Sequence, residues 1–178
     1  MCLMTVIWAL YGYTLVFGGD GPIIGGWKYL FMNNAQAYWN GTESVTPLYP
    51  GLTIPVLTHM LFQGMFFIIT PALICGAFAE RMKFSTMVVF MILWGTFIYC
   101  PLAHCVWGGG ILQFGTGHAE AWGAGGALDF AGGTVVHISS GVSALICALL
   151  LGKRLGFGKA PMPPHNLTYT AIGAAMLW

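Results

Sequence analysis

Asp129 and His137 are the residues of this chain whose types and spacing most clearly indicate chemistry. They lie eight residues apart in the segment 128–151, which is otherwise apolar and small and is followed by Lys153 and Arg154. The segment is long enough to cross a bilayer, and ionisable side chains inside a membrane span usually serve a permeating solute. The pair therefore predicts a transport function.

Two interpretations of Asp129 follow from its place near the start of this segment. Its carboxylate can accept hydrogen bonds from the first free N–H groups of a helix and gains from the positive end of the helix dipole. Plain N-capping is one interpretation. The other is a cap that also shapes a binding site for a cation.

His137 is expected about 12 Å deeper, because each helical residue advances the chain by about 1.5 Å. A lone buried histidine in a soluble core is usually structural. Lipid offers no comparable solvation, so we favour a pore-lining role near the middle of the membrane, with packing as the alternative.

Aromatic side chains form a second candidate group. Phe62 and Phe66 lie one helical turn apart, and Trp107 ends the next apolar segment before three consecutive glycines. Taken singly, each is typical of the aromatic belt at a membrane interface. Converging aromatic faces would instead bind a small cation, with about 2 kcal/mol per contact when the site is desolvated.

The composition predicts the elements that must position these residues. Of 178 residues, 57% are hydrophobic and 6% charged, whereas a soluble domain is about 25% charged. The mean hydropathy is +0.78. We expect an all-α transmembrane bundle, with an extramembrane loop over 18–51 that contains a short helix around 27–37. The expected spans are 1–17, 54–79, 84–107, 128–151 and 167–178. Because the last apolar segment is cut by the chain end, we expect an internal fragment of a longer protein.

Five of the six basic residues predict the orientation, since they fall in two short turns at 81–83 and 153–159. Basic turns usually face the cytoplasm. The loops 18–51 and 108–127 then face outward, and they carry Asp20, Glu43 and Glu120. The expected location is the cell membrane.

The helix that carries His137 is expected to present two faces. A face of small and polar residues should meet other helices, and an apolar face should meet lipid. The first face holds Gly133, Thr134, His137, Ser140, Gly141 and Ala144, and the second holds Val135, Val142, Leu145 and Leu149.

Several other functions are disfavoured. The net charge of +1 argues against nucleic acid as a partner. The five cysteines are interpreted as free, mostly buried thiols. His104 and His137 differ in expected depth by about 9 Å, which argues against a shared metal or haem and leaves a histidine-ligated redox protein as a weak alternative. His59, His118 and His165 are expected to be solvated. We expect no cofactor, no metal and no enzymatic activity.

Six motifs, in order along the chain, resemble the ammonium transporter family (Amt/Mep/Rh). They are FQGMF (62–66), GAFAER (76–81), AHCVWGGG (103–110), LDFAGGTVVH (128–137), GKRLGFG (152–158) and PHNL (164–167). The resemblance covers essentially the whole chain.

The resemblance implies roles for the residues that match. Phe66 and Trp107 correspond to the aromatic walls of an outer ammonium site, with Phe62 beside them. Asp129 corresponds to an aspartate that supports recruitment and deprotonation, and His137 to the first of two pore histidines.

The resemblance also implies a homotrimer of eleven-helix subunits, each with its own pore, and a regulator of nitrogen metabolism at the cytoplasmic face. By this comparison the chain covers roughly the second to sixth helices. It lacks the second pore histidine, an outer serine and a second gating phenylalanine. A sensor with a transporter-like membrane domain is the alternative function.

Overall fold

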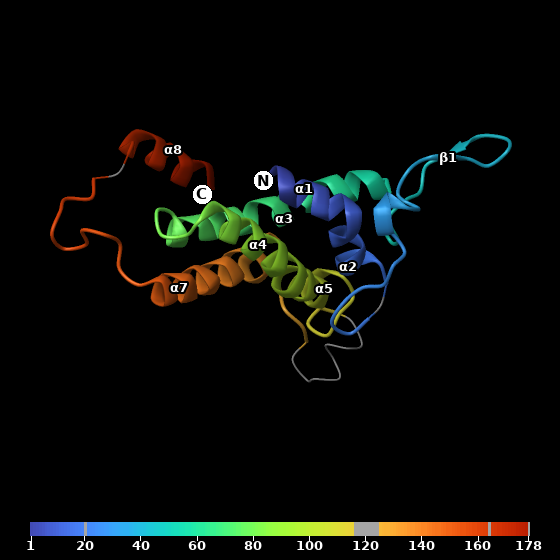
Figure 1. Cartoon of the computed structure of the whole chain (residues 1–178). Coiled ribbons are helices and arrows are strands. Elements are labelled where there is room, and N and C mark those ends of the chain that lie inside the picture. The colour runs from blue at the N-terminus through green and yellow to red at the C-terminus, as the bar shows by residue number, and fades with distance from the viewer. Residues whose placement is uncertain (20, 116–124, 164, 178) are drawn as a thin grey trace.

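The computed structural model describes residues 1–19, 21–115, 125–163 and 165–177. Three of its helices are long and apolar enough to cross a membrane: Val56–Phe78, Phe84–Trp107 and Gly133–Leu151. Figure 1 shows them side by side, with the chain running back and forth between two ends of the bundle. The all-α transmembrane fold class is confirmed.

The N-terminal helix supplies much of the core. It consists of α1 (Cys2–Ile7), a π-helical turn η1 (Trp8–Gly12) and α2 (Tyr13–Phe17). The Trp8 ring stacks on Phe67, with centroids 5.0 Å apart, and its Nε1–H donates to the carbonyl of Met60 at 2.9 Å. A buried indole is therefore both packed and hydrogen-bonded, as burial away from water requires.

The next two spans form an antiparallel pair. The first is α3 (Val56–Phe78), and the second runs through α4 (Phe84–Trp94), the π-helical turn η3 (Gly95–Tyr99) and α5 (Cys100–Trp107). Polar bonds link the second span to its neighbours: Tyr11 Oη lies 2.8 Å from Thr96 Oγ1, and Trp94 Nε1–H donates to Ser143 Oγ at 2.8 Å.

The span that carries His137 begins at Gly133, whereas its apolar segment begins at Leu128. It consists of a π-helical turn η4 (Gly133–Ile138) followed by α7 (Ser139–Leu151). Val142, Leu145 and Leu149 are exposed, as expected for lipid-facing residues, but Val135 is completely buried. The prediction for Val135 was wrong because it assumed 3.6 residues per turn, whereas the π turn rotates the first residues of this span relative to α7.

The described helices cover the face of small and polar residues only in part. Ser140 is buried, whereas Gly133, His137 and Gly141 are exposed and Thr134 and Ala144 are half-buried.

The loop between the first two spans has little regular structure. It contains one 3-10 turn, η2 (Leu30–Met32), and a small antiparallel hairpin of β1 (Tyr38–Trp39) and β2 (Ser44–Val45), in which Tyr38 pairs with Val45. The prediction of a helix over 27–37 was wrong. Phe31, Met32 and Asn34 have positive φ angles, which a right-handed helix excludes.

The remaining connections fix which loops share an end of the bundle. Ile111 N–H donates to the carbonyl of Pro22 at 2.9 Å, so the loops after α2 and α5 meet. Arg81 Nη1 donates to the carbonyl of Gly152, so the turn after α3 meets the end of α7 at the opposite end. The chain then reaches α8 (Leu167–Leu177), whose residues are all exposed (Figure 1). Asp20, His118, Glu120 and Trp178 lie outside the described residues.

Candidate functional site

Three aromatic side chains from two helices come together: Phe62 and Phe66 from the N-terminal half of α3, and Trp107 from the end of α5. The Phe62 and Phe66 rings meet edge to face at 5.3 Å, and the Phe66 and Trp107 rings lie 5.6 Å apart at an interplanar angle of 57°. Phe62 is 60% exposed, whereas Phe66 and Trp107 are half-buried. The structure therefore brings together the three aromatic residues that the sequence singled out.

A hydrogen bond connects this aromatic group to the span that carries His137. Trp107 Nε1–H donates to the backbone carbonyl of Asp129 at 2.7 Å. Trp107 is the last residue of α5, and the chain turns at Gly108 directly after it. The indole is thus held in place by its own helix and by the residue that precedes η4.

The Asp129 carboxylate accepts four backbone hydrogen bonds. Oδ1 accepts from Gly132 (2.6 Å) and Gly133 (2.9 Å), and Oδ2 accepts from Thr134 (2.7 Å) and Val135 (2.9 Å). These are N–H groups at the start of η4 that have no partner within the helix. The capping part of the interpretation of Asp129 is therefore observed.

His137 lies on η4 with its side chain exposed. Its backbone N–H donates to the carbonyl of Gly132 at 2.9 Å, five residues earlier, which is the hydrogen bond of a π turn. The ring makes no hydrogen bond with the rest of the described chain. A lone histidine at the surface of an apolar span has room to contact a further helix or a solute.

A cavity of about 430 Å³ adjoins Trp107 and Asp129. Its wall includes residues that the sequence did not indicate, namely Phe17, Tyr49, His59 and Gln63.

The His59 ring stacks on Tyr49 with centroids 3.9 Å apart, and its Nδ1 lies 3.0 Å from Tyr13 Oη. The expectation of a solvated His59 was wrong, because neighbouring rings cover it to 7% exposure. In the sequence, the only sign that His59 and Gln63 lie in one cavity wall is their spacing of one helical turn, which places both on the same face of a helix.

His104 is completely buried and both of its ring nitrogens are occupied. Nδ1 lies 2.5 Å from the carbonyl oxygen of Val16, and Nε2 lies 2.6 Å from that of Gly21. Neither nitrogen is free to bind a metal. Within the described ranges, no group of three or more His, Cys, Asp or Glu side chains has the geometry of a metal site.

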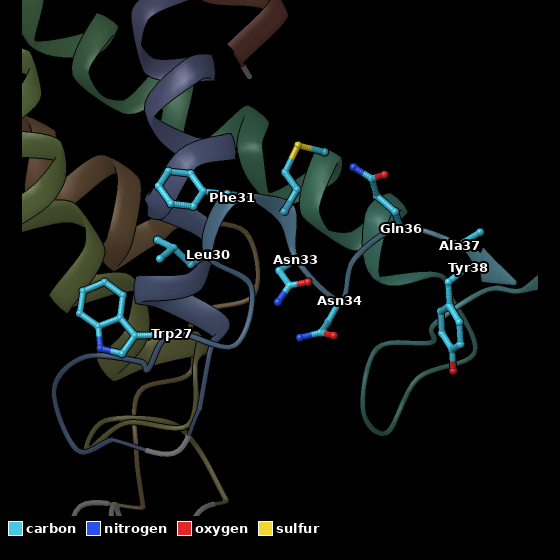
Figure 2. A pocket seen from close by; sticks show the side chains of 9 residues that line it. Trp27, Leu30, Phe31, Asn33, Asn34, Gln36, Ala37 and Tyr38 are labelled. Carbon is cyan, nitrogen blue, oxygen red and sulfur yellow. The ribbon is translucent and has the colours of Figure 1, made fainter. Parts of the chain in front are cut away.

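A larger hollow, of about 720 Å³, lies in the loop 27–38. Figure 2 shows its wall, in which Trp27, Phe31, Asn34 and Tyr38 come from one stretch of chain. It contains none of the residues predicted to bind a solute. The structure thus joins four of the predicted site residues, Phe62, Phe66, Trp107 and Asp129, and shows no contact between this group and the His137 side chain within the described residues.

Comparison with known proteins decides the family. The sequence profile of the Ammonium Transporter Family matches residues 1–178. The chain belongs to this family. It is 44% identical over 180 residues to an ammonium transporter of Bacillus subtilis and 40% identical over 179 residues to ammonium transporter Amt1 of Archaeoglobus fulgidus. All of this chain is covered in both alignments, but only 39% of each relative.

Solved structures agree with this assignment to the ammonium transporter family. The structure superposes on Candida albicans Mep2 with a TM-score of 0.76 at 34% identity, covering 99% of this chain and 36% of that one. For Saccharomyces cerevisiae Mep2 the TM-score is 0.72 at 33% identity, over 99% and 36% of the two chains. The chain thus spans about two fifths of the length of its relatives.

Proposed function

We propose that the protein containing this chain transports ammonium across the cell membrane. NH4+ binds at the aromatic group of Phe62, Phe66 and Trp107, gives its proton to water of the outer solution near Asp129, and passes as NH3 along an apolar path beside His137. One observation carries this proposal: the hydrogen bond from Trp107 to the Asp129 carbonyl links the aromatic group to the helix on which His137 lies.

Aromatic faces suit ammonium because the cation is small and carries one charge. A cation over a desolvated indole or phenyl face gains about 2 kcal/mol. K+ gains similarly but has no hydrogen to donate or to lose. Selectivity then comes from the deprotonation step and from the apolar path, which admits the neutral molecule and excludes the ion.

Asp129 is a positioning residue in this proposal. Each of its carboxylate oxygens already accepts two N–H groups, so we do not assign it the ammonium proton. Its negative charge favours a nearby cation, and its carbonyl orients the Trp107 ring. The exposed ring of His137 is available to contact the neutral solute, since an imidazole both donates and accepts hydrogen bonds.

We further propose a homotrimer in which each subunit has its own pore, with a cytoplasmic regulator of nitrogen metabolism as a partner. Membership of the ammonium transporter family supports both assignments. Ammonium or ammonia and the lipid bilayer are the remaining partners.

The test is the replacement Trp107→Ala in the complete coding sequence that contains this chain. Loss of one desolvated cation–π contact should raise the half-saturating ammonium concentration about tenfold or more and change the maximal flux less. Uptake of labelled methylammonium over a range of concentrations measures both quantities. Trp39→Ala is the matched control, because Trp39 is 69% exposed in the outer hairpin. An unchanged half-saturation in Trp107→Ala would remove Trp107 from the site.

A further inference from the structure

Two tripeptides of the chain match the acceptor motif for N-linked glycosylation, in which Asn is followed by any residue except proline and then by Ser or Thr. They are Asn40-Gly41-Thr42 and Asn166-Leu167-Thr168. Sugar is transferred on the side of the membrane that faces away from the cytoplasm, to an asparagine that the transferase can reach. The structure distinguishes the two motifs by both requirements.

Asn166 meets neither requirement. Its Oδ1 accepts the backbone N–H of Tyr169 at 3.0 Å, so its side chain caps the start of α8. The residue is half-buried, and it follows the basic turn at 153–159, on the side of the membrane that is predicted to be cytoplasmic. A transferase would have to break this helix start on the wrong side of the membrane.

Asn40 meets both requirements. Residues 36–44 are all exposed, and the hairpin that contains them projects beyond the end of the bundle that lies opposite the basic turns (Figure 1). Gly41, at the tip, has a φ of 100°, and nothing lies within 4 Å of its Cβ position. A bulky substituent on Asn40 therefore has open space around it.

The reactive groups of this motif are free. Asn40 Oδ1 accepts the backbone N–H groups of Thr42 at 2.9 Å and of Glu43 at 2.8 Å. In the part of the chain that the structure describes, Asn40 Nδ2 and the Thr42 hydroxyl have no hydrogen-bond partner. Nδ2 is the atom that bonds to the sugar, and the hydroxyl two residues later is the group that the transferase recognises.

A second observation is the hollow of about 720 Å³ in the loop 27–38, which reaches this motif. Its lining includes Tyr38, two residues before Asn40. Two residues of extended chain span about 7 Å and place their side chains on the same face. No residue of the lining is charged. The hollow therefore suits a neutral ligand that is attached at Asn40.

The wall of the hollow combines aromatic faces with free amides, which are the groups that bind sugars. Trp27, Phe31 and Tyr38 are 70%, 69% and 56% exposed. Figure 2 shows the Trp27 and Phe31 rings on one side and the Tyr38 ring on the other. The amides of Asn33 and Gln36 have no partner among the described residues. Aromatic faces pack against the C–H groups of a sugar ring, and amides donate and accept hydrogen bonds with its hydroxyls.

We propose that Asn40 carries an N-linked glycan whose first sugars lie against Tyr38 in this hollow. The donor is an oligosaccharide joined to a lipid through pyrophosphate. Asn40 Nδ2 bonds to the anomeric carbon, the bond from that carbon to the pyrophosphate oxygen breaks, and the lipid pyrophosphate leaves with the electron pair. A base of the transferase takes one amide proton, and nothing is oxidised or reduced.

The glycan accounts for the aromatic rings that this loop exposes. Contiguous apolar surface on a water-facing loop favours association, and bound sugars would cover it. The motif lies outside the group of Phe62, Phe66, Trp107 and Asp129, so the proposal does not depend on ammonium transport.

The first test is peptide mapping by tandem mass spectrometry of the full-length protein, purified from the membranes of its source organism. The peptide that contains Asn40 should be heavier by one or more sugar residues, and the peptide that contains Asn166 should be unmodified. Asn40→Gln and Thr42→Ala should abolish the modification. Thr42→Ser keeps the hydroxyl and should retain it, and Asn166→Gln is the control that should change nothing.

The second test asks whether the glycan contacts the hollow. Tyr38→Ala should lower the melting temperature in detergent when the sugar is present, and this fall should disappear in the Asn40→Gln background. Trp39→Ala is the matched control, because Trp39 is the next residue of the strand and points to the other face. Its effect should be the same in both backgrounds.

Four results would overturn the proposal. An unmodified Asn40 in the source membranes would show that no glycan is attached. Sugar retained in Thr42→Ala would show that the motif is not what the transferase recognises. Sugar on Asn166 would contradict the orientation on which the proposal rests. An equal fall in melting temperature for Tyr38→Ala with and without Asn40 would remove the glycan from the hollow.

Discussion

At the scale of single residues, Asp129 determines the geometry of the candidate site. Its side chain caps η4 and its carbonyl accepts the indole N–H of Trp107, so one residue fixes both the start of the span that carries His137 and the ring that borders the aromatic group. A change in the side chain should therefore disturb the helix start first and the aromatic group as a consequence.

Asp129→Asn should weaken this helix start. An amide has one acceptor oxygen, so two of the four N–H groups lose their partner and face an NH2 donor instead. We expect a loss of about 2 kcal/mol in stability, typical of a lost N-cap, and faster hydrogen exchange at the amides of 132–135. Hydrogen exchange read by mass spectrometry and the melting temperature in detergent measure these effects. Glu43→Gln is the control: it makes the same charge change on the exposed hairpin and should alter neither the hydrogen exchange nor the melting temperature. Unchanged hydrogen exchange in Asp129→Asn would contradict the capping role.

The sequence predicted the meeting of the aromatic rings and the capping by Asp129, but not every contact around them. Residue type and spacing identified Phe62, Phe66, Trp107, Asp129 and His137, because an ionisable or aromatic side chain in an apolar span is conspicuous. The burial of His59 was missed. Its covering ring, Tyr49, comes from a loop whose path no periodicity specifies.

At the scale of elements, close approach between α2 and α5 positions Trp107. A Cβ atom on Gly108 would lie 2.0 Å from the carbonyl oxygen of Val16. The same carbonyl oxygen lies 2.5 Å from Nδ1 of His104, so it is contacted by the residue three positions before Trp107 and approached by the one directly after it. The absence of a side chain at Gly108 allows this approach.

Gly108→Ala should therefore force α5 away from α2. Overpacking against backbone costs about 3 kcal/mol, because neither partner is a flexible side chain. The melting temperature should fall, and methylammonium uptake should fall further as Trp107 shifts. Gly141→Ala is the control: Gly141 is helical, nothing lies within 4 Å of its Cβ position, and alanine favours the helix. If the two variants melt at the same temperature, the contact does not hold the helices together.

Element boundaries also show where sequence reasoning fails. The apolar segments specified the number and order of the helices, because lipid permits little else than helices. The sequence did not predict the π turns. Apolar periodicity is analysed at 3.6 residues per turn, and a single wider turn changes neither the composition nor the length of an apolar segment. Val135 was placed on the wrong face for this reason.

At the scale of the whole molecule, the loops divide between two ends. The hairpin and the residues around Pro22 and Ile111 lie at one end, and the basic turns that meet through Arg81 and Gly152 lie at the other. The excess of basic residues at the second end predicts that it faces the cytoplasm.

Cysteine labelling of intact cells tests this orientation in a variant without the five native cysteines. Thr42→Cys, in the hairpin, should react with a membrane-impermeant maleimide added outside. Lys159→Cys, in the basic turn, should react only after permeabilisation. The reverse pattern would invert the topology and place the aromatic group at the cytoplasmic side.

The measurement that tests the central claim most directly is ammonium flux into proteoliposomes that contain the full-length protein. We expect saturable flux above that of empty liposomes, no comparable K+ flux, and altered conduction or selectivity in His137→Asp, since a charged carboxylate then replaces an imidazole on the proposed path. Flux no greater than that of empty liposomes would contradict ammonium transport. Flux in His137→Asp indistinguishable from the parent for every ion would leave His137 a packing residue.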